Sequence, residues 1–213
     1  MAIDGPAGAG KSTVARAVAR ALGYRYLDSG AMYRAVALRA LEKGVDVDDH
    51  EGLAELAHAA RIELGEERVL LDAQDVTERI RDGDVTSAVS KVAAHPQVRA
   101  ALVDTQRALG TGGNVVVEGR DIGSAVFPDA DVKIFLTASL EERAARRALQ
   151  RGLTTDRETI ARVAADIAAR DAADSSRATS PLVQAPDAVV VDTTGRPVEA
   201  VVEEIVGLVR SRT

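Results

Sequence analysis

The sequence predicts an α/β fold in which a parallel β-sheet is flanked by helices, because strand-like and helix-like segments alternate along most of its 213 residues. Residues 114–117 and 132–136 are apolar and rich in β-branched side chains, which is typical of strands buried in a parallel sheet. Residues 188–191 form a similar run near the end of the chain. Shorter strands are predicted at residues 2–4 and 24–27.

Helices are predicted between these strands, where apolar side chains recur at the spacing of an α-helix. Gly44 ends one of them, and Pro96 fits the first turn of another. The predicted helices cover residues 14–22, 31–43, 50–60, 96–109, 140–150, 157–173 and a closing stripe from Val198 to Val209.

The stretch at approximately 61–91 interrupts this alternation. Residues 61–64 and 68–71 predict a small hairpin with a glycine turn, and two short helices follow at 77–80 and 85–92. We find no internal repeat, low-complexity segment or linker. The chain is therefore interpreted as one folding unit in which this stretch is a small inserted lobe.

The composition excludes several classes of function. The formal net charge is −6, whereas a protein that holds nucleic acid along a broad surface is usually basic. Three tyrosines, two phenylalanines and no tryptophan are too few for a base-stacking platform. There is no cysteine, no signal segment, and no apolar run near the roughly 20 residues that span a bilayer. We therefore expect a cytoplasmic protein that binds small anions, with neither nucleic acid nor a membrane as its partner.

The most informative motif is Gly5-Pro-Ala-Gly-Ala-Gly-Lys-Ser-Thr13, which matches the phosphate-binding pattern G-x-x-x-x-G-K-[ST] at every fixed position. Its glycines let backbone N–H groups point at a polyphosphate, and the following helix adds the positive end of its dipole. Lys11 would reach the outer phosphates, and Ser12 would bind magnesium. The alternative is a Gly/Ala-rich turn capped by Ser12, but the strand before the motif and the helix after it favour nucleotide binding. The predicted binding residues are Gly5, Pro6, Ala7, Gly8, Ala9, Gly10, Lys11, Ser12 and Thr13.

Among proteins with such a loop, the GTPases are disfavoured. Guanine recognition in that class uses Asn-Lys-x-Asp, and none of the lysines at positions 11, 43, 91 and 133 has those neighbours. The segment Asp-Thr-Thr-Gly at 192–195 fits the loose Asp-x-x-Gly pattern of that class. We interpret it as the turn after the last strand.

Arginines gather at turns and helix ends. Arg34 follows Ser29 by five residues, so a helix that begins there would aim both side chains toward one point. Arg120 and Asp121 lie between glycines at the carboxyl end of a predicted strand, which is the edge where open α/β sheets bind ligands.

Two further helices carry spaced arginines. Arg143 and Arg147 share a helix face, and Arg170, Asp174 and Arg177 repeat that spacing further along the chain. The alternative for each pair is a solvated helix face with ion pairs. For phosphoryl transfer to a nucleoside monophosphate, however, arginine is well suited, because its planar fork binds phosphate oxygens in pairs and keeps its proton. The acceptor phosphate is already ionised near pH 7, so no general base is needed.

The chain resembles the bacterial cytidylate kinases, which are P-loop enzymes of the nucleoside monophosphate kinase family, over essentially its whole length. The first matching segment, IDGPAGAGKST at 3–13, is shared by many kinases, whereas the combination of segments is specific to this family. The others are LDSGAMYR at 27–34, VEGRDIG at 117–123, VFPDADVKIFL at 126–136, and Arg170-Asp171, Asp174, Arg177 and Pro181-Leu182.

The resemblance implies a monomer that transfers the γ-phosphoryl group of ATP, with Mg²⁺, to CMP or dCMP. It implies a single kinase domain over residues 1–213, with an acceptor-binding lobe inserted at approximately 61–91 and a mobile lid at approximately 148–160. Another small-molecule kinase, such as an adenylate or shikimate kinase, is the second reading, and a nucleotide-dependent switch protein is the third.

The resemblance also implies a role for each matching residue. Lys11, Arg120, Arg147 and Arg177 would be catalytic, and Arg143 and Arg147 would flank the lid near ATP. The remaining roles concern the acceptor: Ser29, Tyr33, Arg34, Arg120 and Arg177 would surround its phosphate, Arg170 and Asp174 would face its ribose, and Ser90, Arg99 and Asp121 would read its cytosine.

Overall fold

The computed structural model describes residues 1–65, 67–177 and 179–212. The chain divides into two compact units. Unit 1 combines both ends of the chain, Met1–Tyr24 and Val116–Thr213, and unit 2 comprises Arg25–Val115. Unit 2 thus contains the stretch 61–91 together with longer segments on both sides of it.

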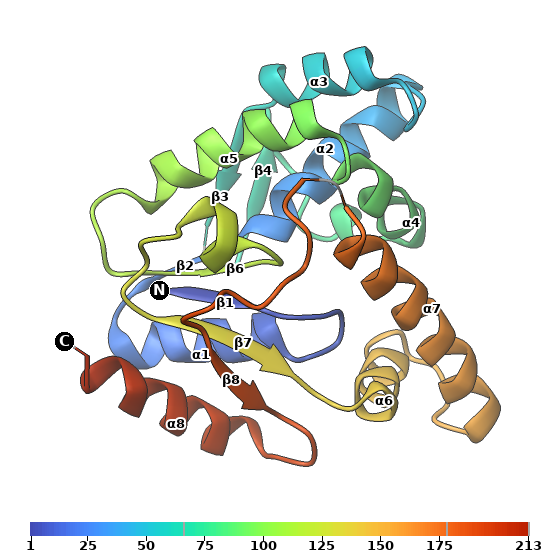
Figure 1. The fold of residues 1–213 in the computed structure, drawn as a ribbon. Coiled ribbons are helices and arrows are strands. Elements are labelled where there is room, and N and C mark those ends of the chain that lie inside the picture. The colour runs from blue at the N-terminus through green and yellow to red at the C-terminus, as the bar shows by residue number, and fades with distance from the viewer. Residues whose placement is uncertain (66, 178, 213) are drawn as a thin grey trace. The chain divides into compact units, whose positions relative to one another are not determined.

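The sheet of unit 1 is parallel, as the sequence predicts. Strands β1 (Ala2–Asp4), β6 (Val115–Glu118), β7 (Lys133–Thr137) and β8 (Val189–Asp192) are hydrogen-bonded in the order β6-β1-β7-β8 (Figure 1). β1 pairs in parallel with both β6 and β7, so it is central within this set of strands. Its three residues are fully buried, in agreement with an apolar strand at the middle of a sheet.

Four helices of unit 1 pack in two pairs. Helix α1 (Lys11–Leu22) contacts β1 and lies beside α8 (Val198–Arg210). Helix α6 (Leu140–Gln150) lies along α7 (Arg157–Ser175), and the two are joined by a short loop (Figure 1). Small apolar residues of α6 and α7 pack together with Ala7, so the phosphate-loop motif rests on this helix pair. A five-residue π-helix, η2 (Ile122–Val126), follows β6 and was not predicted.

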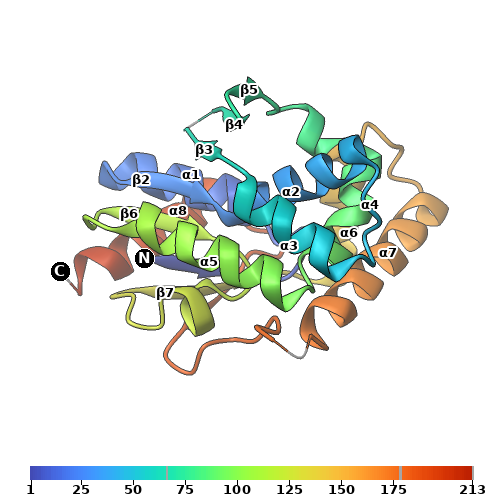
Figure 2. The same ribbon diagram turned by 90° about the horizontal axis from the view of Figure 1, so that it is seen from above.

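Unit 2 is mainly helical around an apolar core. Met32, Leu38, Leu53 and Ile80 are completely buried in that core. Figure 2 shows α3 lying beside α5, and the small strands β3, β4 and β5 next to one another. Its elements are β2 (Arg25–Asp28), α2 (Ser29–Lys43), α3 (His50–Ala59), β3 (Ile62–Leu64), β4 (Val69–Leu71), β5 (Gln74–Asp75), the 3₁₀ turn η1 (Arg79–Arg81), α4 (Gly83–Val92) and α5 (Pro96–Gly110).

Two details of unit 2 differ from the sequence-based expectation. The predicted hairpin is present, since β3 pairs antiparallel with β4, but β5 adds a third strand to it. Helix α2 begins two residues earlier than predicted, and its N-cap is Asp28, whose carboxylate accepts the Ala31 N–H at 3.0 Å. Ser29 is therefore the first helical residue and not the N-cap. In the described part of the chain, no helix is both long enough and apolar enough to cross a membrane.

Candidate active site

The phosphate-loop motif folds as a tight loop between β1 and α1. Gly5 has a φ of +146°, and a Cβ added there would lie 2.0 Å from the carbonyl oxygen of Leu136, so glycine is required. Gly8 and Gly10 also have positive φ values, of 78° and 89°. Gly10, not Ser12, is the N-cap of α1, and it makes no side-chain cap hydrogen bond. The interpretation of the motif as a turn capped by Ser12 is therefore wrong, and the first amides of α1 are available to an anion.

Lys11 is held inside this loop in a strongly perturbed state. Its ammonium is buried and donates to the carbonyl oxygen of Pro6 at 2.8 Å. Burial, followed by repulsion from Arg120, lowers the pKa of Lys11 to about 7, although Glu118 and Asp4 act in the opposite direction. A polyphosphate bound next to Lys11 would stabilise its charged form and so raise its pKa again. Ser12 and Thr13, by contrast, are exposed at the first turn of α1.

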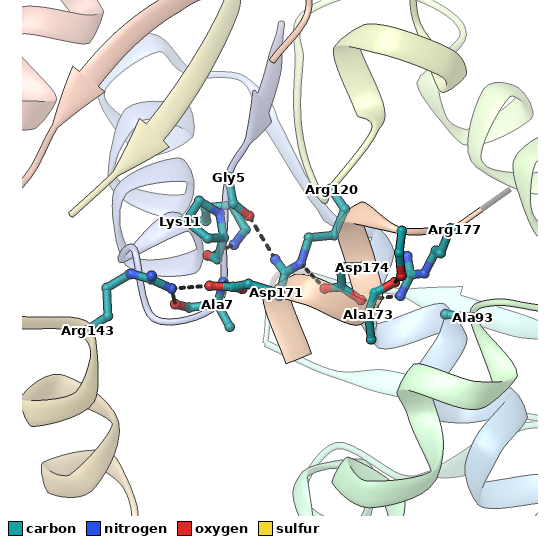
Figure 3. Close-up of polar contacts among 12 residues, drawn as sticks. Gly5, Ala7, Lys11, Ala93, Arg120, Arg143, Asp171, Ala173, Asp174 and Arg177 are labelled. Carbon is teal, nitrogen blue, oxygen red and sulfur yellow. Dashed lines mark hydrogen bonds and ion pairs between the residues drawn. The ribbon is translucent and has the colours of Figure 1, made fainter. Parts of the chain in front are cut away.

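Arg120, Asp174 and Arg177 form one ion-pair cluster in unit 1 (Figure 3). Arg120 is far from the other two in the sequence, whereas Asp174 and Arg177 are three positions apart. Arg120 donates from Nε to Asp174 at 2.9 Å and from Nη1 to the carbonyl oxygen of Gly5 at 3.1 Å. Arg177 donates to the other oxygen of Asp174. Burial acts to raise the pKa of Asp174, but the attraction of Arg120 and Arg177 outweighs it and the pKa is lowered. The structure thus places two predicted acceptor arginines together, beside the phosphate loop.

Arg170 belongs to the same electrostatic environment. It lies on α7, and its charge contributes to lowering the pKa of Asp174 and that of Lys11. The charges of Arg120 and Arg170 therefore both act on Lys11. Such a concentration of guanidinium groups is the environment in which the negative charge of a transferring phosphoryl group is stabilised.

Arg143 lies beneath the phosphate loop. It is buried, and it donates to the carbonyl oxygen of Ala138 at 3.1 Å and to that of Ala7 at 2.9 Å. It also pairs with Asp171, whose other oxygen accepts the N–H of Ala7 at 3.0 Å (Figure 3). The geometry makes Arg143 and Asp171 the support of the loop. Arg147, which shares its helix, is half-buried and donates to Gln150 at 3.5 Å.

Arg146 and Thr193 are site residues that sequence reasoning missed. A Cβ added at Gly10 would lie 3.7 Å from Nη1 of Arg146, so this guanidinium lies beside the start of α1. Arg146 donates to the hydroxyl and carbonyl oxygens of Thr193 at 2.9 and 2.8 Å. Thr193 in turn lies within hydrogen-bond distance of the Ala9 carbonyl oxygen, at 3.3 Å. The segment 192–195 is the turn that the sequence predicts, and no local signal shows that it contacts the loop.

Of the other predicted acceptor residues, Asp121 is buried in unit 1 at the N-cap of η2, and the rest lie in unit 2. Ser29 is buried at the first turn of α2, and Arg34 on the same helix pairs with Asp28 at 2.6 Å. Both residues thus belong to the first two turns of α2, and that their side chains meet at one point stays a prediction. The Asp28 carboxylate holds this arginine and caps the helix at the same time.

Tyr33 and Arg99 form a second group in unit 2. The guanidinium carbon of Arg99 lies 5.4 Å from the centre of the Tyr33 ring, which is a cation–π distance. Arg99 is 4% exposed and donates to the carbonyl oxygen of Ala93 at 3.3 Å. Ser90 lies on α4 and is half-buried. Arg99 is therefore part of the interior of unit 2.

Known proteins resemble this chain over nearly its whole length. A family model described as cytidylate kinase matches residues 1–211. A cytidylate kinase of Pelotomaculum thermopropionicum is 53% identical over 98% of this chain and 95% of its own length. A second, from Symbiobacterium thermophilum, is 51% identical over 96% and 93%. The solved structure of a gluconokinase from Sinorhizobium meliloti aligns over 99% of this chain and 91% of its own, with a TM-score of 0.52 at 16% identity, which is a likeness of fold alone.

Proposed function

Because the chain belongs to the cytidylate kinase family, we propose that it transfers the γ-phosphoryl group of ATP to CMP or dCMP, giving ADP and CDP or dCDP. The observation that carries this proposal is the placement of Lys11 beside the Arg120–Asp174–Arg177 cluster. A curled loop of amides and a concentration of guanidinium groups suit a reaction whose chief demand is to position and neutralise phosphates.

We propose that the phosphate loop binds ATP. Its amides would hold the phosphates, and Lys11 would leave the carbonyl oxygen of Pro6 to reach the β- and γ-phosphates. Ser12 is exposed at the start of α1 and offers a hydroxyl oxygen, which is the kind of ligand that Mg²⁺ prefers. The residues present therefore fit the ion, which would neutralise phosphate charge when bound. Within the described residues, no group of three or more His, Cys, Asp or Glu side chains could hold a metal by itself.

Arg120 and Arg177 would bind the acceptor phosphate and the charge that spreads over the transferring group. Asp174 orients both of them, because each of its oxygens accepts from one guanidinium. The proposed role of Arg147 is to add positive charge from α6 when the segment 148–160 closes as a lid. Closure would exclude the water that otherwise competes with the acceptor.

Asp121 is proposed to recognise the cytosine base. It is buried after β6, and a carboxylate accepts a hydrogen bond from the exocyclic amine of cytosine. Uracil carries a carbonyl oxygen at that place, so it would meet Asp121 with two acceptors facing each other.

The Asp121→Asn variant should prefer CMP over UMP less strongly than the wild type. One well-made hydrogen-bond pair to a base edge discriminates by roughly 1–3 kcal/mol, so selectivity should fall by about tenfold to a hundredfold. The measurement is kcat/KM for CMP and for UMP with each protein. Asp129→Asn makes the same chemical change at an exposed position and should leave selectivity intact. Equal selectivity in the wild type and the Asp121 variant would refute the role.

ATP binding should be accompanied by proton uptake at pH 8. With a pKa of about 7, Lys11 is mostly neutral at that pH in the free protein, and polyphosphate would raise its pKa and charge it. We expect uptake of nearly one proton per site. Isothermal calorimetry of a non-hydrolysable ATP analogue, in buffers of different ionisation enthalpy, measures it as the slope of binding enthalpy against buffer enthalpy. A slope indistinguishable from zero would contradict the perturbed state of Lys11.

The function as a whole is tested by a panel of acceptors in a coupled steady-state assay. CMP and dCMP should be phosphorylated with the highest kcat/KM, and UMP, AMP and shikimate should lag behind them. Preference for AMP or shikimate would indicate a different small-molecule kinase. Slow ATP hydrolysis that no acceptor accelerates would instead indicate a nucleotide-dependent switch.

A further inference from the structure

We propose that Asp4, the last residue of β1, is a positioning residue for phosphoryl transfer that holds residues 120–123 in place relative to the phosphate loop. This inference rests on the proposed function and concerns the same site. It assigns a role to a carboxylate that precedes the phosphate-binding motif and lies outside its fixed positions.

Both oxygens of the Asp4 carboxylate accept hydrogen bonds from the backbone that follows β6. Its Oδ1 accepts the N–H of Ile122 at 2.8 Å, and its Oδ2 accepts the N–H of Gly123 at 2.7 Å. These are the first two amides of the π-helix η2, and Asp4 is 5% exposed. A carboxylate with one backbone amide on each oxygen fixes both the position and the rotation of the segment that donates to it.

Gly5, which follows Asp4, makes a second hydrogen bond to the same segment. The carbonyl oxygen of Gly5 accepts from Nη1 of Arg120 at 3.1 Å. Asp4 thus holds the backbone on one side of Asp121 while Gly5 holds the side chain of Arg120 on the other. Two consecutive residues at the start of the phosphate loop therefore set where the acceptor-binding side chains lie.

The side chains of Lys133 and Asp4 both lie close to Gly123. A Cβ added at Gly123 would lie 3.4 Å from Oδ2 of Asp4 and 3.1 Å from the side chain of Lys133. The ammonium of Lys133 pairs with Asp187 at 2.8 Å and so is directed to a carboxylate other than that of Asp4. A methyl group at Gly123 would therefore meet the flexible side chain of Lys133 first and would lie at ordinary van der Waals distance from Asp4.

The charges that face Asp4 make this contact sensitive to pH. Burial raises the pKa of Asp4 to about 6, the amides of Gly123 and Ile122 oppose the rise, repulsion from Asp121 adds to it, and Lys11 counteracts it. A protonated carboxyl turns an O–H toward one of the two amides and loses that hydrogen bond. Residues 120–123 should therefore be held less firmly as pH falls through about 6.

The test compares Asp4→Asn with Asp129→Asn, which makes the same change at an exposed position of unit 1. In Asp4→Asn, an amide N–H₂ would face one of the two backbone donors. We expect kcat/KM for CMP to fall by about tenfold to a hundredfold, which is the usual effect of losing one hydrogen bond to a charged group. The amides of Ile122 and Gly123 should also exchange with deuterium faster, whereas Asp129→Asn should match the wild type in both measurements.

The pH profile separates positioning from general loss of structure. As pH falls through about 6, the wild type should lose kcat/KM for CMP more steeply than protonation of the CMP phosphate alone accounts for, whereas Asp4→Asn should show only the decline due to that phosphate. If Asp4→Asn does not fold, the wild type still tests the proposal: protection of the Ile122 and Gly123 amides, corrected for the intrinsic pH dependence of exchange, should fall between pH 7 and pH 5. Wild-type kinetics and exchange in folded Asp4→Asn, or protection of these two amides that does not change between pH 7 and pH 5, would overturn the proposal. A wild type that does not phosphorylate CMP would instead overturn the proposed function.

Discussion

Replacing Lys11 with alanine should lower kcat for CMP phosphorylation by a factor of about 100 to 1,000, which is the usual cost of removing one preorganised donor to transition-state charge. The expected loss follows from the state of this lysine. It is buried, it donates to the carbonyl oxygen of Pro6, and its pKa is lowered to about 7. Binding of the ATP phosphates would raise this pKa, so that the lysine takes up a proton and becomes positively charged. Without Lys11, the β- and γ-phosphates lose the ammonium group that would contact them, and the uncharged amides of the loop cannot replace its positive charge.

The measurement is a coupled assay of kcat and of KM for both nucleotides. Lys43→Ala is the matched control, because Lys43 is exposed at the end of α2 and belongs to no predicted site. It should retain wild-type kinetics. If Lys11→Ala kept more than about a third of wild-type kcat, the assignment of Lys11 to the transferring phosphate would fail. Thermal unfolding of each variant distinguishes lost chemistry from lost fold.

Replacing Arg120 with alanine should lower kcat/KM for CMP by about a thousandfold or more, on the scale found for arginines that stabilise transferring phosphoryl groups. Arg120 contacts both parts of the site: its Nε holds Asp174 and its Nη1 holds the carbonyl oxygen of Gly5. The variant therefore removes a phosphate ligand and also leaves Asp174 with Arg177 as its remaining partner in this cluster. Both effects weaken acceptor binding in the transition state.

Arg120→Lys should recover little of this activity, because a single ammonium cannot donate along two directions as the guanidinium does. Arg20→Ala, at an exposed position of α1, is the control and should behave as the wild type. If Arg120→Lys were nearly as active as the wild type, positive charge alone would be sufficient. The proposal that the planar guanidinium must donate in two directions would then be refuted.

The phosphate loop could be predicted from the sequence because its information is local. All its fixed positions lie within nine residues, and the positive φ values of Gly5, Gly8 and Gly10 require the residue type that is present. The alternation of strands and helices was predicted for the same reason, since the periods of 2 and 3.6 residues are properties of short segments. Helix ends are less well determined by such local patterns, and α2 begins two residues before its predicted start.

The phosphate loop, the parallel sheet and the family can be recognised in the sequence, whereas the contacts of each arginine depend on how the helices pack. Helical spacing shows that Arg143 and Arg147 share a face of α6, but the docking of α6 against the loop and α7 decides that Arg143 supports Ala7 and that Arg146 lies beside Gly10. The contact of Asp4 with residues 122 and 123 was equally hidden, because its partners lie more than 100 positions away. Spacing along a chain constrains neighbours, and only packing brings distant charges to one point.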